Sequence, residues 1–301
     1  MTLSLITSDE VAEALAARRP VVALETTLVS HGFSGGRGLA AAVESEDRVR
    51  ASGAVPATVG ILDGAVRVGL GRPSLERFAE QGAAARKVGA RDIAACVVQG
   101  ALGSTTVGGT LAVCRMTGIT FMATGGIGGV HRGFAESLDI SADLIQIART
   151  PAVVVCSGAK SILDVPATAE LLETLAVPVL GWQTPTLPLF YTAAGGPPVS
   201  AVVRNAAEVA QVARAHWALN PSGGLVLARP PADGLDLTDL ITSAVQRVRA
   251  AGLTGQAVTP AVLAMIEELS GGRSVAVNRA LIADNAGLAG EVAVAHAVLG
   301  G

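Results

Sequence analysis

Two short apolar runs in the middle of the chain limit the folds that this sequence can adopt. Residues 119–123 (ITFMA) and 152–156 (AVVVC) carry almost no polar side chains. Apolar runs of this length are typical of strands that are buried on both faces, as in a parallel sheet. A helical pattern at residues 168–175 follows the second run, and alternation of strands and helices predicts an α/β protein.

Both apolar runs end in turns that are suited to ligand binding. Residues 124–129 (TGGIGG) follow the first run and lead into His131 and Arg132, whereas residues 157–160 (SGAK) follow the second. In an open α/β sheet, ligands bind at the carboxyl ends of the strands. Glycines let backbone N–H groups approach a bound anion, and His131 and Arg132 add donors that suit a phosphate. We therefore expect a phosphate-binding site at these turns.

Lysine is rare in this chain, and its two positions are informative. Lysine and arginine together number 22, yet only Lys87 and Lys160 are lysines. Unlike arginine, lysine can lose its proton and become a nucleophile. For Lys160, which closely follows a buried strand, we favour a chemical role over a surface cation. For Lys87, between Arg86 and Arg91, both interpretations remain open.

Acidic side chains are candidates for proton transfer and metal binding. Glu25 follows the apolar residues 21–24 and precedes two threonines, so we expect it in a site at a strand end rather than as a helix cap. Glu136, Asp139 and Asp143 lie close together in the sequence. Their carboxylates are the ligands that a hard divalent cation prefers.

Composition argues against several classes of protein. The net charge is −3 and no basic block occurs, so we expect neither nucleic acid nor an anionic membrane as a partner. No apolar run approaches the ~20 residues of a membrane helix, and the first residues lack the layout of a signal peptide. Cys96, Cys114 and Cys156 are set among apolar neighbours, which predicts reduced thiols in a cytoplasmic protein.

Local patterns predict further elements of the structure. Asp63-Gly64, between two apolar runs, predicts a β-hairpin. Residues 92–99 predict a strand, with Lys87 in the loop before it. Residues 33–38 (FSGGRG) predict a flexible loop. Residues 182–200, rich in proline and aromatic side chains, predict an ordered loop over a cleft.

Two familiar nucleotide-binding motifs are incomplete in this sequence. In residues 126–131, histidine stands where a dinucleotide fingerprint requires its third glycine. Before Lys160-Ser161, Ala159 occupies the position of the obligatory glycine of a phosphate-binding P-loop. A nucleotide-hydrolysing function therefore has little support.

Longer runs of the sequence resemble one known enzyme family, the pseudouridine-5'-phosphate glycosidases. The runs are VALETTLVSHG (22–32), GAVPATVGILDG (53–64), FMATGGIGGVHRG (121–133), LDISADL (138–144), CSGAKSILD (156–164) and NPSGGLVLA (220–228). The spacing from Gly271-Gly272 to Asn278 and Asn285 matches as well. The resemblance covers nearly the whole chain and implies a single domain over residues 1–301. It also implies a three-layer α/β/α architecture, with helices flanking a mixed, mostly parallel sheet.

The same resemblance implies an activity and a cofactor. Family members interconvert pseudouridine 5'-phosphate and water with uracil and ribose 5-phosphate, through a covalent lysine intermediate and a glutamate proton donor. They are typically homotrimers that use manganese, which implies one Mn²⁺ per subunit here.

Site residues carry over from the family position by position. Lys160 matches the nucleophile, Glu25 the proton donor and Asp139 the manganese ligand. Positions that match substrate contacts are Lys87, Val107, Thr124, His131, Ser141, Ala142, Asp143 and Asn278.

The chain departs from the family pattern at two places. Residues 33–38 replace a loop that usually contains proline and asparagine, and Asp284-Asn285 replaces a pair of asparagines. Two other functions remain as alternatives. One is a different Schiff-base enzyme, such as an aldolase acting on another phosphosugar, which release of uracil would distinguish. The other is a non-catalytic phosphosugar-binding protein, which would bind without turnover.

Overall fold

A computed structural model describes residues 3–33, 36–253 and 258–300. Its strands are β1 (Leu5–Thr7), β2 (Val21–Glu25), β3 (Val55–Leu62), β4 (Ala65–Val68), β5 (Arg86–Val88), β6 (Gly103–Thr105), β7 (Phe121–Ala123), β8 (Val153–Cys156), β9 (Val179–Trp182), β10 (Ala201–Val203) and β11 (Leu225–Ala228).

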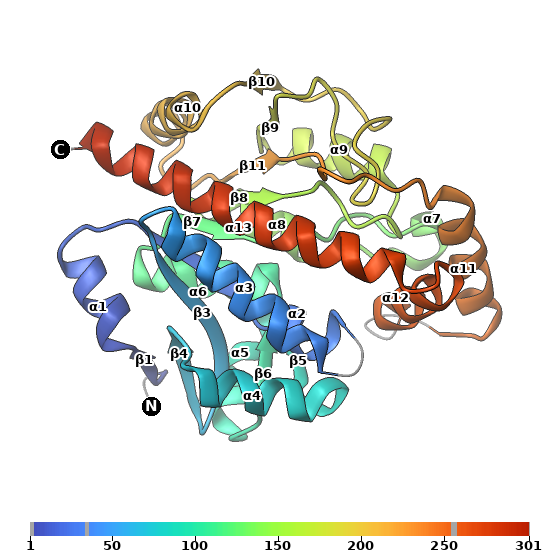
Figure 1. The fold of residues 1–301 in the computed structure, drawn as a ribbon, viewed down its shortest axis with the longest axis horizontal. Coiled ribbons are helices and arrows are strands. Elements are labelled where there is room, and N and C mark those ends of the chain that lie inside the picture. The colour runs from blue at the N-terminus through green and yellow to red at the C-terminus, as the bar shows by residue number, and fades with distance from the viewer. Residues whose placement is uncertain (1–2, 34–35, 254–257, 301) are drawn as a thin grey trace.

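The helices surround this set of strands (Figure 1). They are α1 (Asp9–Ala16), α2 (Thr27–His31), α3 (Arg37–Ala51), α4 (Arg72–Gln81), α5 (Ile93–Val98), α6 (Val107–Thr117), α7 (Phe134–Ser137), α8 (Asp143–Ala148), α9 (Val165–Thr174), α10 (Ala206–Leu219), α11 (Thr238–Ala250), α12 (Val258–Leu269) and α13 (Arg273–Gly300), with short 3₁₀ turns at Gly82–Ala84 and Ala90–Asp92.

All strands belong to one sheet. Its main path runs β1-β4-β3-β2-β7-β8-β11-β9-β10, and β6 joins β3 and β5 at its side. The pairs are parallel except for β3 with β4 and β3 with β6. Parallel neighbours require long crossover connections, which the helices supply. The predicted mixed, mostly parallel sheet is therefore confirmed.

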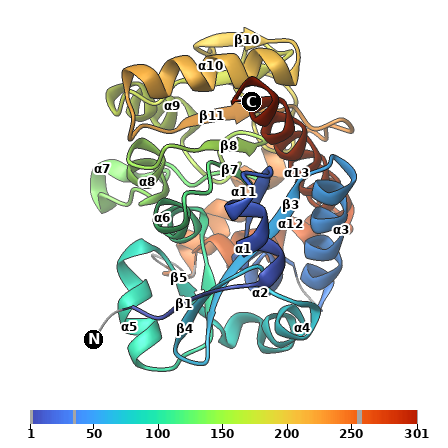
Figure 2. The same ribbon diagram turned by 90° about the vertical axis from the view of Figure 1, so that its left-hand side faces the viewer.

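Alternate residues along each strand face opposite layers of helices, as the pleat requires. In β8, Val153 and Val155 belong to the core beneath α3, α10 and α13. Val154 and Cys156 belong to the core on the side of α6, α8 and α9. Figure 2 shows α3 and α13 on one side of the sheet and α6 and α8 on the other. The three-layer α/β/α prediction is confirmed.

The first and last parts of the chain share this architecture. Helix α13 lies across the sheet and packs against α3, α10 and the strands β2, β7 and β8. A helix from the end of the chain thereby completes a core built on the first strands. The described residues form a single domain, and none of their helices is long and apolar enough to cross a membrane.

Several local predictions are confirmed. Asp63 and Gly64, with φ of 53° and 70°, form the turn between β3 and β4. Positive φ at both central residues is typical of a type I' hairpin turn. The loop at 182–200 is ordered, with isolated bridges between its halves and with Phe190 and Tyr191 buried.

The prediction of a strand at residues 92–99 is wrong. This run contains α5, and its buried residues Ile93, Cys96 and Val97 are spaced three and four apart, which is the period of one helix face. Lys87 lies on β5, which pairs with β6, and not in a loop. Short apolar runs do not distinguish a strand from a buried helix by composition alone.

The region after β2 also differs from the prediction. The short helix α2 follows the strand directly and brings His31 to its last turn. Of the loop expected at 33–38, residues 34 and 35 lie outside the described residues, and α3 already begins at Arg37.

Candidate active site

The carboxyl ends of neighbouring strands bring the predicted catalytic residues together. Glu25 is the last residue of β2, and the pairing of Leu24 with Ala123 of β7 places Thr124 beside it. Strand β8 lies next to β7, and the turn after it carries Lys160. Lys87 comes from β5, and Glu25, Lys87 and Lys160 line one cavity.

Glu25 is a buried carboxyl group, with only 4% of its surface exposed. The hydroxyl of Thr124 donates a hydrogen bond to Glu25 Oε1. Burial raises the pKa of Glu25, and this effect outweighs the opposing influences of Lys160, of the Thr124 hydroxyl and of Lys87. A carboxyl group with a raised pKa can hold a proton near neutral pH and deliver it to a substrate.

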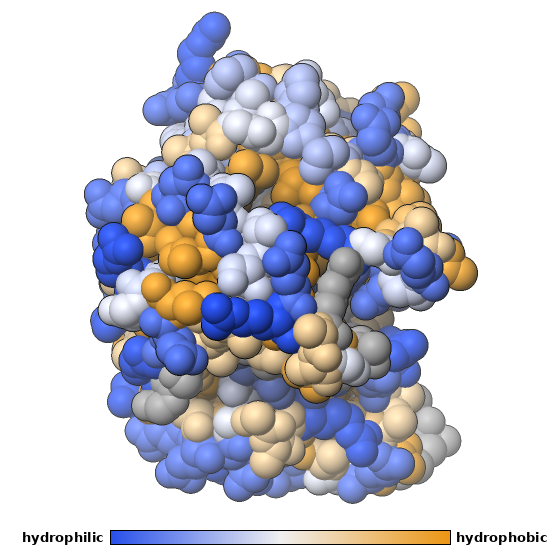
Figure 3. Space-filling model, turned by 90° about the vertical axis from the view of Figure 1, so that its right-hand side faces the viewer, coloured by the Kyte–Doolittle hydropathy of each residue, from blue (hydrophilic) through white to orange (hydrophobic). Residues whose placement is uncertain are grey.

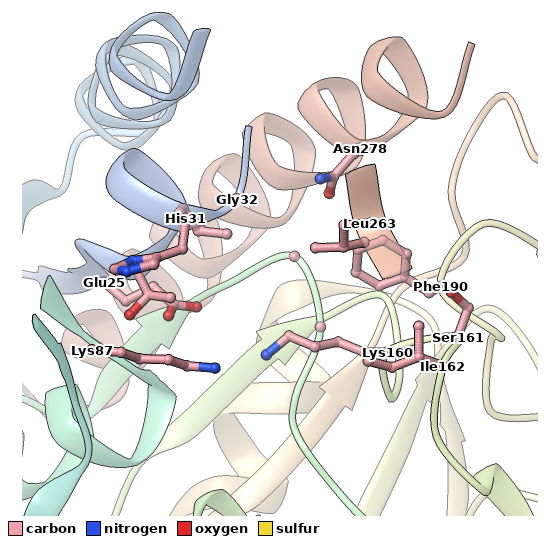
Figure 4. A pocket seen from close by; sticks show the side chains of 14 residues that line it. Glu25, His31, Gly32, Lys87, Lys160, Ser161, Ile162, Phe190, Leu263 and Asn278 are labelled. Atoms are coloured by element: carbon pink, nitrogen blue, oxygen red, sulfur yellow. The ribbon is translucent and has the colours of Figure 1, made fainter. Parts of the chain in front are cut away.

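The two lysines of the chain face each other. Figure 4 shows the amino groups of Lys87 and Lys160 pointing toward one another across the cavity. Burial, and then the charge of Lys160, lower the pKa of Lys87. The charge of Lys160 thus favours the neutral form of Lys87.

The cavity has two lobes that share Glu25, Thr27, Lys87 and Lys160. The first, which we call the apolar lobe, is further lined by Leu28, His31, Ser161, Ile162, Phe190, Leu263 and Asn278, among others. The second, which we call the polar lobe, is further lined by Thr106, Gly128, His131 and residues 139–143, among others. Figure 4 shows the apolar lobe, with Asn278 reaching in from α13 and the Phe190 ring and Leu263 beside it.

Three buried polar atoms beside the apolar lobe have no hydrogen-bond partner within the described part of the chain. They are His31 Nδ1, Ser161 Oγ and Asn278 Oδ1, and all three residues line this lobe. Burying a polar atom without a partner costs about 1–3 kcal/mol. Such atoms gathered at one cavity indicate that a ligand or water completes their hydrogen bonds.

His31 presents a hydrogen-bond acceptor. Its ring makes one hydrogen bond to the backbone of Ala85, while Nδ1 has no partner among the described residues. Burial and the nearby charge of Lys87 lower the pKa of His31, so the ring is neutral at neutral pH. A neutral imidazole that donates through one nitrogen accepts through the other.

Asp143 holds the polar lobe together from within. Its Oδ1 accepts from the N–H of Gly108 at 2.8 Å, and its Oδ2 accepts from the N–H of Gly128 at 2.9 Å. This carboxylate therefore connects the first turn of α6 to the glycine-rich turn after β7. Gly128 is needed for the approach, because a Cβ at this position would collide with Ser141 and Asp143.

The glycine-rich turn is less available to an anion than the sequence indicates. The N–H groups of Ile127, Gly128 and Val130 donate to Gly158, Asp143 and Thr168, respectively. Gly126 instead permits close packing, because a Cβ there would meet the ring of Phe190. The turn thus shapes the walls of both lobes as much as it offers donors.

The predicted three-carboxylate cation site does not form. Within the described residues, no three histidine, cysteine, aspartate or glutamate side chains come together as a metal-binding group. Glu136 lines a neighbouring hollow, and both oxygens of Asp143 already accept hydrogen bonds. Asp139 does line the polar lobe, with its Oδ2 at 3.8 Å from His131 Nδ1. One such carboxylate fits a divalent ion whose other ligands are water and substrate oxygens, as for Mg²⁺-type sites.

The structure brings most of the residues expected from the sequence to this cavity. Lys87, His131, Ser141, Ala142, Asp143 and Asn278 line it, as do Glu25, Asp139 and Lys160. Thr124 lies behind Glu25, to which it donates a hydrogen bond. The side chain of Val107 is fully buried in the core at the start of α6.

Other lining residues were not expected from the sequence. His31, Ser161, Phe190 and Leu263 come from α2, from the residue after Lys160, from the loop before β10 and from α12. Phe190 lies in the proline-rich segment expected to cover a cleft, and His31 and Ser161 lie in runs that carry the family resemblance. Leu263 had no sequence signal.

Comparisons with known proteins identify relatives over nearly the full length of the chain. The sequence model of a family described as "Indigoidine synthase A like protein" matches residues 10–295. A protein of Chloroflexus aurantiacus named pseudouridine-5'-phosphate glycosidase is 46% identical, covering 97% of this chain and 99% of the relative. A protein of Streptomyces griseus with the same name is 48% identical, covering 96% of this chain and 91% of the relative. The chain belongs to the pseudouridine-5'-phosphate glycosidase family.

A solved structure agrees with this assignment. The prealnumycin C-glycosynthase AlnA, in complex with ribulose 5-phosphate, is 40% identical and has a TM-score of 0.90, covering 100% of this chain and 99% of AlnA. The family inferred from the sequence runs around Glu25 and Lys160 is thereby confirmed. This chain and a C-glycosynthase thus share one overall fold.

Proposed function

We propose that this protein reversibly cleaves pseudouridine 5'-phosphate with water to uracil and ribose 5-phosphate. One observation carries the proposal. A buried carboxyl group with a raised pKa, Glu25, shares a cavity with both lysines of the chain, between an apolar and a polar lobe. The names of the relatives support the reaction, and the ribulose 5-phosphate bound by AlnA supports a sugar phosphate as ligand.

The bond to be broken joins ribose C1' to C5 of uracil, so no oxygen or nitrogen leaving group is available for protonation. In our proposal, neutral Lys160 attacks C1' with its Nζ. The bond from C1' to the ring oxygen breaks, and this oxygen takes the proton that the nitrogen loses. The product is an open-chain amine adduct on Lys160.

Glu25 then acts as the proton donor. Protonation of uracil at C5 allows the C1'–C5 bond to break, and its electron pair stays with the uracil. The nitrogen lone pair forms a protonated imine at C1'. Water hydrolyses this imine to ribose 5-phosphate and frees Lys160, which returns a proton to the Glu25 carboxylate through the site. The buried environment of Glu25 supports this role, because it favours the protonated acid.

The two lobes suggest how the substrate lies. In this proposal, a flat base lies in the apolar lobe beside Phe190 and Leu263. There, atoms of His31, Ser161 and Asn278 that have no partner among the described residues would bind its polar groups. His31 Nδ1 and Asn278 Oδ1 are acceptors, and a C5-linked uracil keeps both of its N–H donors free. The polar lobe, with His131 and Ser141, would take the phosphate.

The proposed cofactor is one Mn²⁺ per subunit, with Asp139 as its protein ligand in the polar lobe. The residues present fit an ion that completes its coordination with water and substrate oxygens. When bound, a divalent ion supplies positive charge against the substrate phosphate and orients water.

We also propose that the protein assembles as a homotrimer. Several large apolar side chains of the described surface are exposed, among them Phe134, Leu138 and Ile140 at and after α7. Figure 3 faces the end of the molecule that carries α7, α11 and α12 and shows apolar areas among polar ones. Light scattering should give about 90 kDa, three times the chain mass of 30.1 kDa. A mass of one or two chains would contradict this.

The experiment that tests the function combines turnover with covalent trapping. Purified protein with Mn²⁺ is expected to release uracil from pseudouridine 5'-phosphate. Borohydride with ribose 5-phosphate should then leave a pentose-phosphate adduct on the peptide that contains Lys160. An adduct on Lys87 would exchange the roles of the two lysines. Binding without uracil release or adduct would favour a phosphosugar-binding protein.

A second candidate function follows from the likeness to AlnA. A C-glycosynthase forms the kind of bond that a C-glycosidase breaks, so the same Lys160 and Glu25 would serve either direction. The rates of bond formation between ribose 5-phosphate and either uracil or larger aromatic acceptors distinguish the two functions. Preference for a larger acceptor over uracil would favour the C-glycosynthase.

A further inference from the structure

Asn285 is a fully buried amide on α13, with none of its surface exposed. Its Nδ2 donates to the backbone oxygen of Thr124 at 2.9 Å and to Ser157 Oγ at 3.1 Å. The return contact from Ser157 Oγ to Asn285 Oδ1 is long, at 3.5 Å. The two bonds from Nδ2 therefore carry the connection.

The two partners of Asn285 belong to the segments next to Glu25 and Lys160. The Thr124 hydroxyl donates to the Glu25 carboxyl group. Ser157 begins the turn that leads to Lys160, and the N–H of Ser157 donates to the oxygen of Gly125 at 2.9 Å. One amide thus joins the segment that supports Glu25 to the segment that carries Lys160.

Asn285 itself is not among the residues that line either lobe. We propose that Asn285 is a positioning residue, which holds the proton donor and the lysine turn at a fixed separation without touching the substrate. This inference rests on the roles proposed above for Glu25 and Lys160.

The neighbouring residue on α13 stabilises the helix in a different way. The Asp284 carboxylate lies 3.0 Å from Arg229, which follows β11, and 3.9 Å from Arg48 of α3. These ion pairs hold α13 to the rest of the domain but do not reach Thr124 or Ser157. Asp284 therefore offers a matched control for effects that come from helix stability alone.

Loss of the amide should alter the proton donor in a recognisable way. The Thr124 hydrogen bond favours the Glu25 carboxylate and so opposes the increase in pKa that burial causes. The other charged groups that act on Glu25 are Lys160, Lys87 and Asp143. If Thr124 moves, the pKa of Glu25 rises further. Cleavage, which needs the protonated acid, would then persist to higher pH.

The test compares Asn285→Ala and Asn285→Asp with Asp284→Asn. Asn285→Asp keeps the shape of the side chain and removes its N–H donors. We expect both Asn285 variants to lower kcat for pseudouridine 5'-phosphate by about 10–100-fold with little change in KM, since small displacements of reacting groups have effects of this size. We also expect the alkaline limb of the pH profile, where activity falls, to shift to higher pH. Asp284→Asn should lower the Tm about as much as the Asn285 variants do, while kcat stays nearly unchanged.

Two results would overturn the inference. One is an Asn285→Ala enzyme whose kcat and pH profile match those of the wild type. The other is a fall in kcat that Asp284→Asn reproduces at the same loss of Tm.

The positioning role of Asn285 can be tested even without turnover. If the wild-type protein releases no uracil, the proposed reaction fails. The pKa of Glu25 can still be measured by ¹³C NMR, with the signal assigned by its absence in Glu25→Gln. A higher pKa in Asn285→Ala supports the positioning role, and an unchanged pKa refutes it.

Discussion

The apolar and polar lobes of the cavity differ in how their polar atoms are used. In the apolar lobe, His31 Nδ1, Ser161 Oγ and Asn278 Oδ1 have no partner within the described part of the chain. In the polar lobe, both oxygens of Asp143 accept backbone hydrogen bonds. Unpaired buried atoms indicate contacts that a ligand completes, whereas fully paired ones indicate scaffold. Residues of the first kind should therefore affect recognition, and Asp143 should affect the shape of the site.

The lysine between the lobes provides the test with the largest expected effect. Lys160→Ala removes the amine that forms the proposed imine, so uracil release should fall to the level of the assay blank. Borohydride trapping with ribose 5-phosphate should also disappear. Lys87→Ala is the matched comparison, which should weaken substrate binding yet still give an adduct on Lys160. Full activity of Lys160→Ala would refute the proposed covalent mechanism.

Glu25→Gln should cause the next largest loss. General acid catalysis contributes about 10²–10⁴-fold, so cleavage should fall by this factor without vanishing. Trapping of ribose 5-phosphate on Lys160 should persist, because imine formation from the free sugar needs no proton on uracil C5. Stopped assays of uracil release and of adduct mass measure the two steps separately. Loss of both to the same extent would mean that Glu25 serves the lysine rather than the base.

A substitution in the apolar lobe should affect recognition of the base alone. Asn278→Leu removes an acceptor but keeps a side chain of similar size. We expect kcat/KM for pseudouridine 5'-phosphate to fall by about 10–100-fold, the equivalent of one buried hydrogen bond. The concentration of ribose 5-phosphate needed for half-maximal trapping should not change. A change in that concentration would show that the two lobes are not separate in function.

A substitution in the polar lobe should have the reverse pattern. Asp139→Asn weakens the proposed metal ligand, and Asp139 also lies close to His131. We expect a rise of about 10-fold in KM and a loss of the response to added Mn²⁺, because in such a site one carboxylate supplies much of the protein's contribution to metal binding. Titration with Mn²⁺ at fixed substrate measures this. An unchanged Mn²⁺ response would exclude Asp139 as the ligand.

The smallest expected effect concerns stability rather than activity. The pKa of Glu25 is raised in the folded protein above its ordinary value of 4.5. Its contribution to stability is therefore complete below that value and is lost as the pH rises through the folded-state pKa. Glu25→Gln cannot ionise, so its Tm should exceed that of the wild type by about 1–4 °C at alkaline pH. Thermal denaturation at several pH values should show this difference shrink toward pH 4.5. A constant difference would mean that the gain does not come from ionisation.

Much of the fold and part of the site could be predicted from the sequence. The apolar run at residues 152–156 and the Asp63-Gly64 turn predicted β8 and a hairpin, because burial on both faces and positive φ leave clear signals in composition. The run at 92–99 was wrongly predicted to be a strand, because its helical spacing is visible only once Ile93, Cys96 and Val97 are known to be buried. Glu25 and Lys160 were predicted because both follow buried strands.

The sequence by itself determined the family, the α/β alternation and the candidate reactive groups, since each depends on residue types and their local order. Only the tertiary structure decided which polar groups are used and which are free. Asp143 and Asn278 are both polar residues near the site. Asp143 is paired with two backbone N–H groups, whereas Asn278 Oδ1 has no partner within the described part of the chain. Likewise, Asn285 meets Thr124 and Ser157 only because α13 packs across the ends of β7 and β8. Hydrogen-bond partners distant in the sequence depend on packing, and local patterns do not record them.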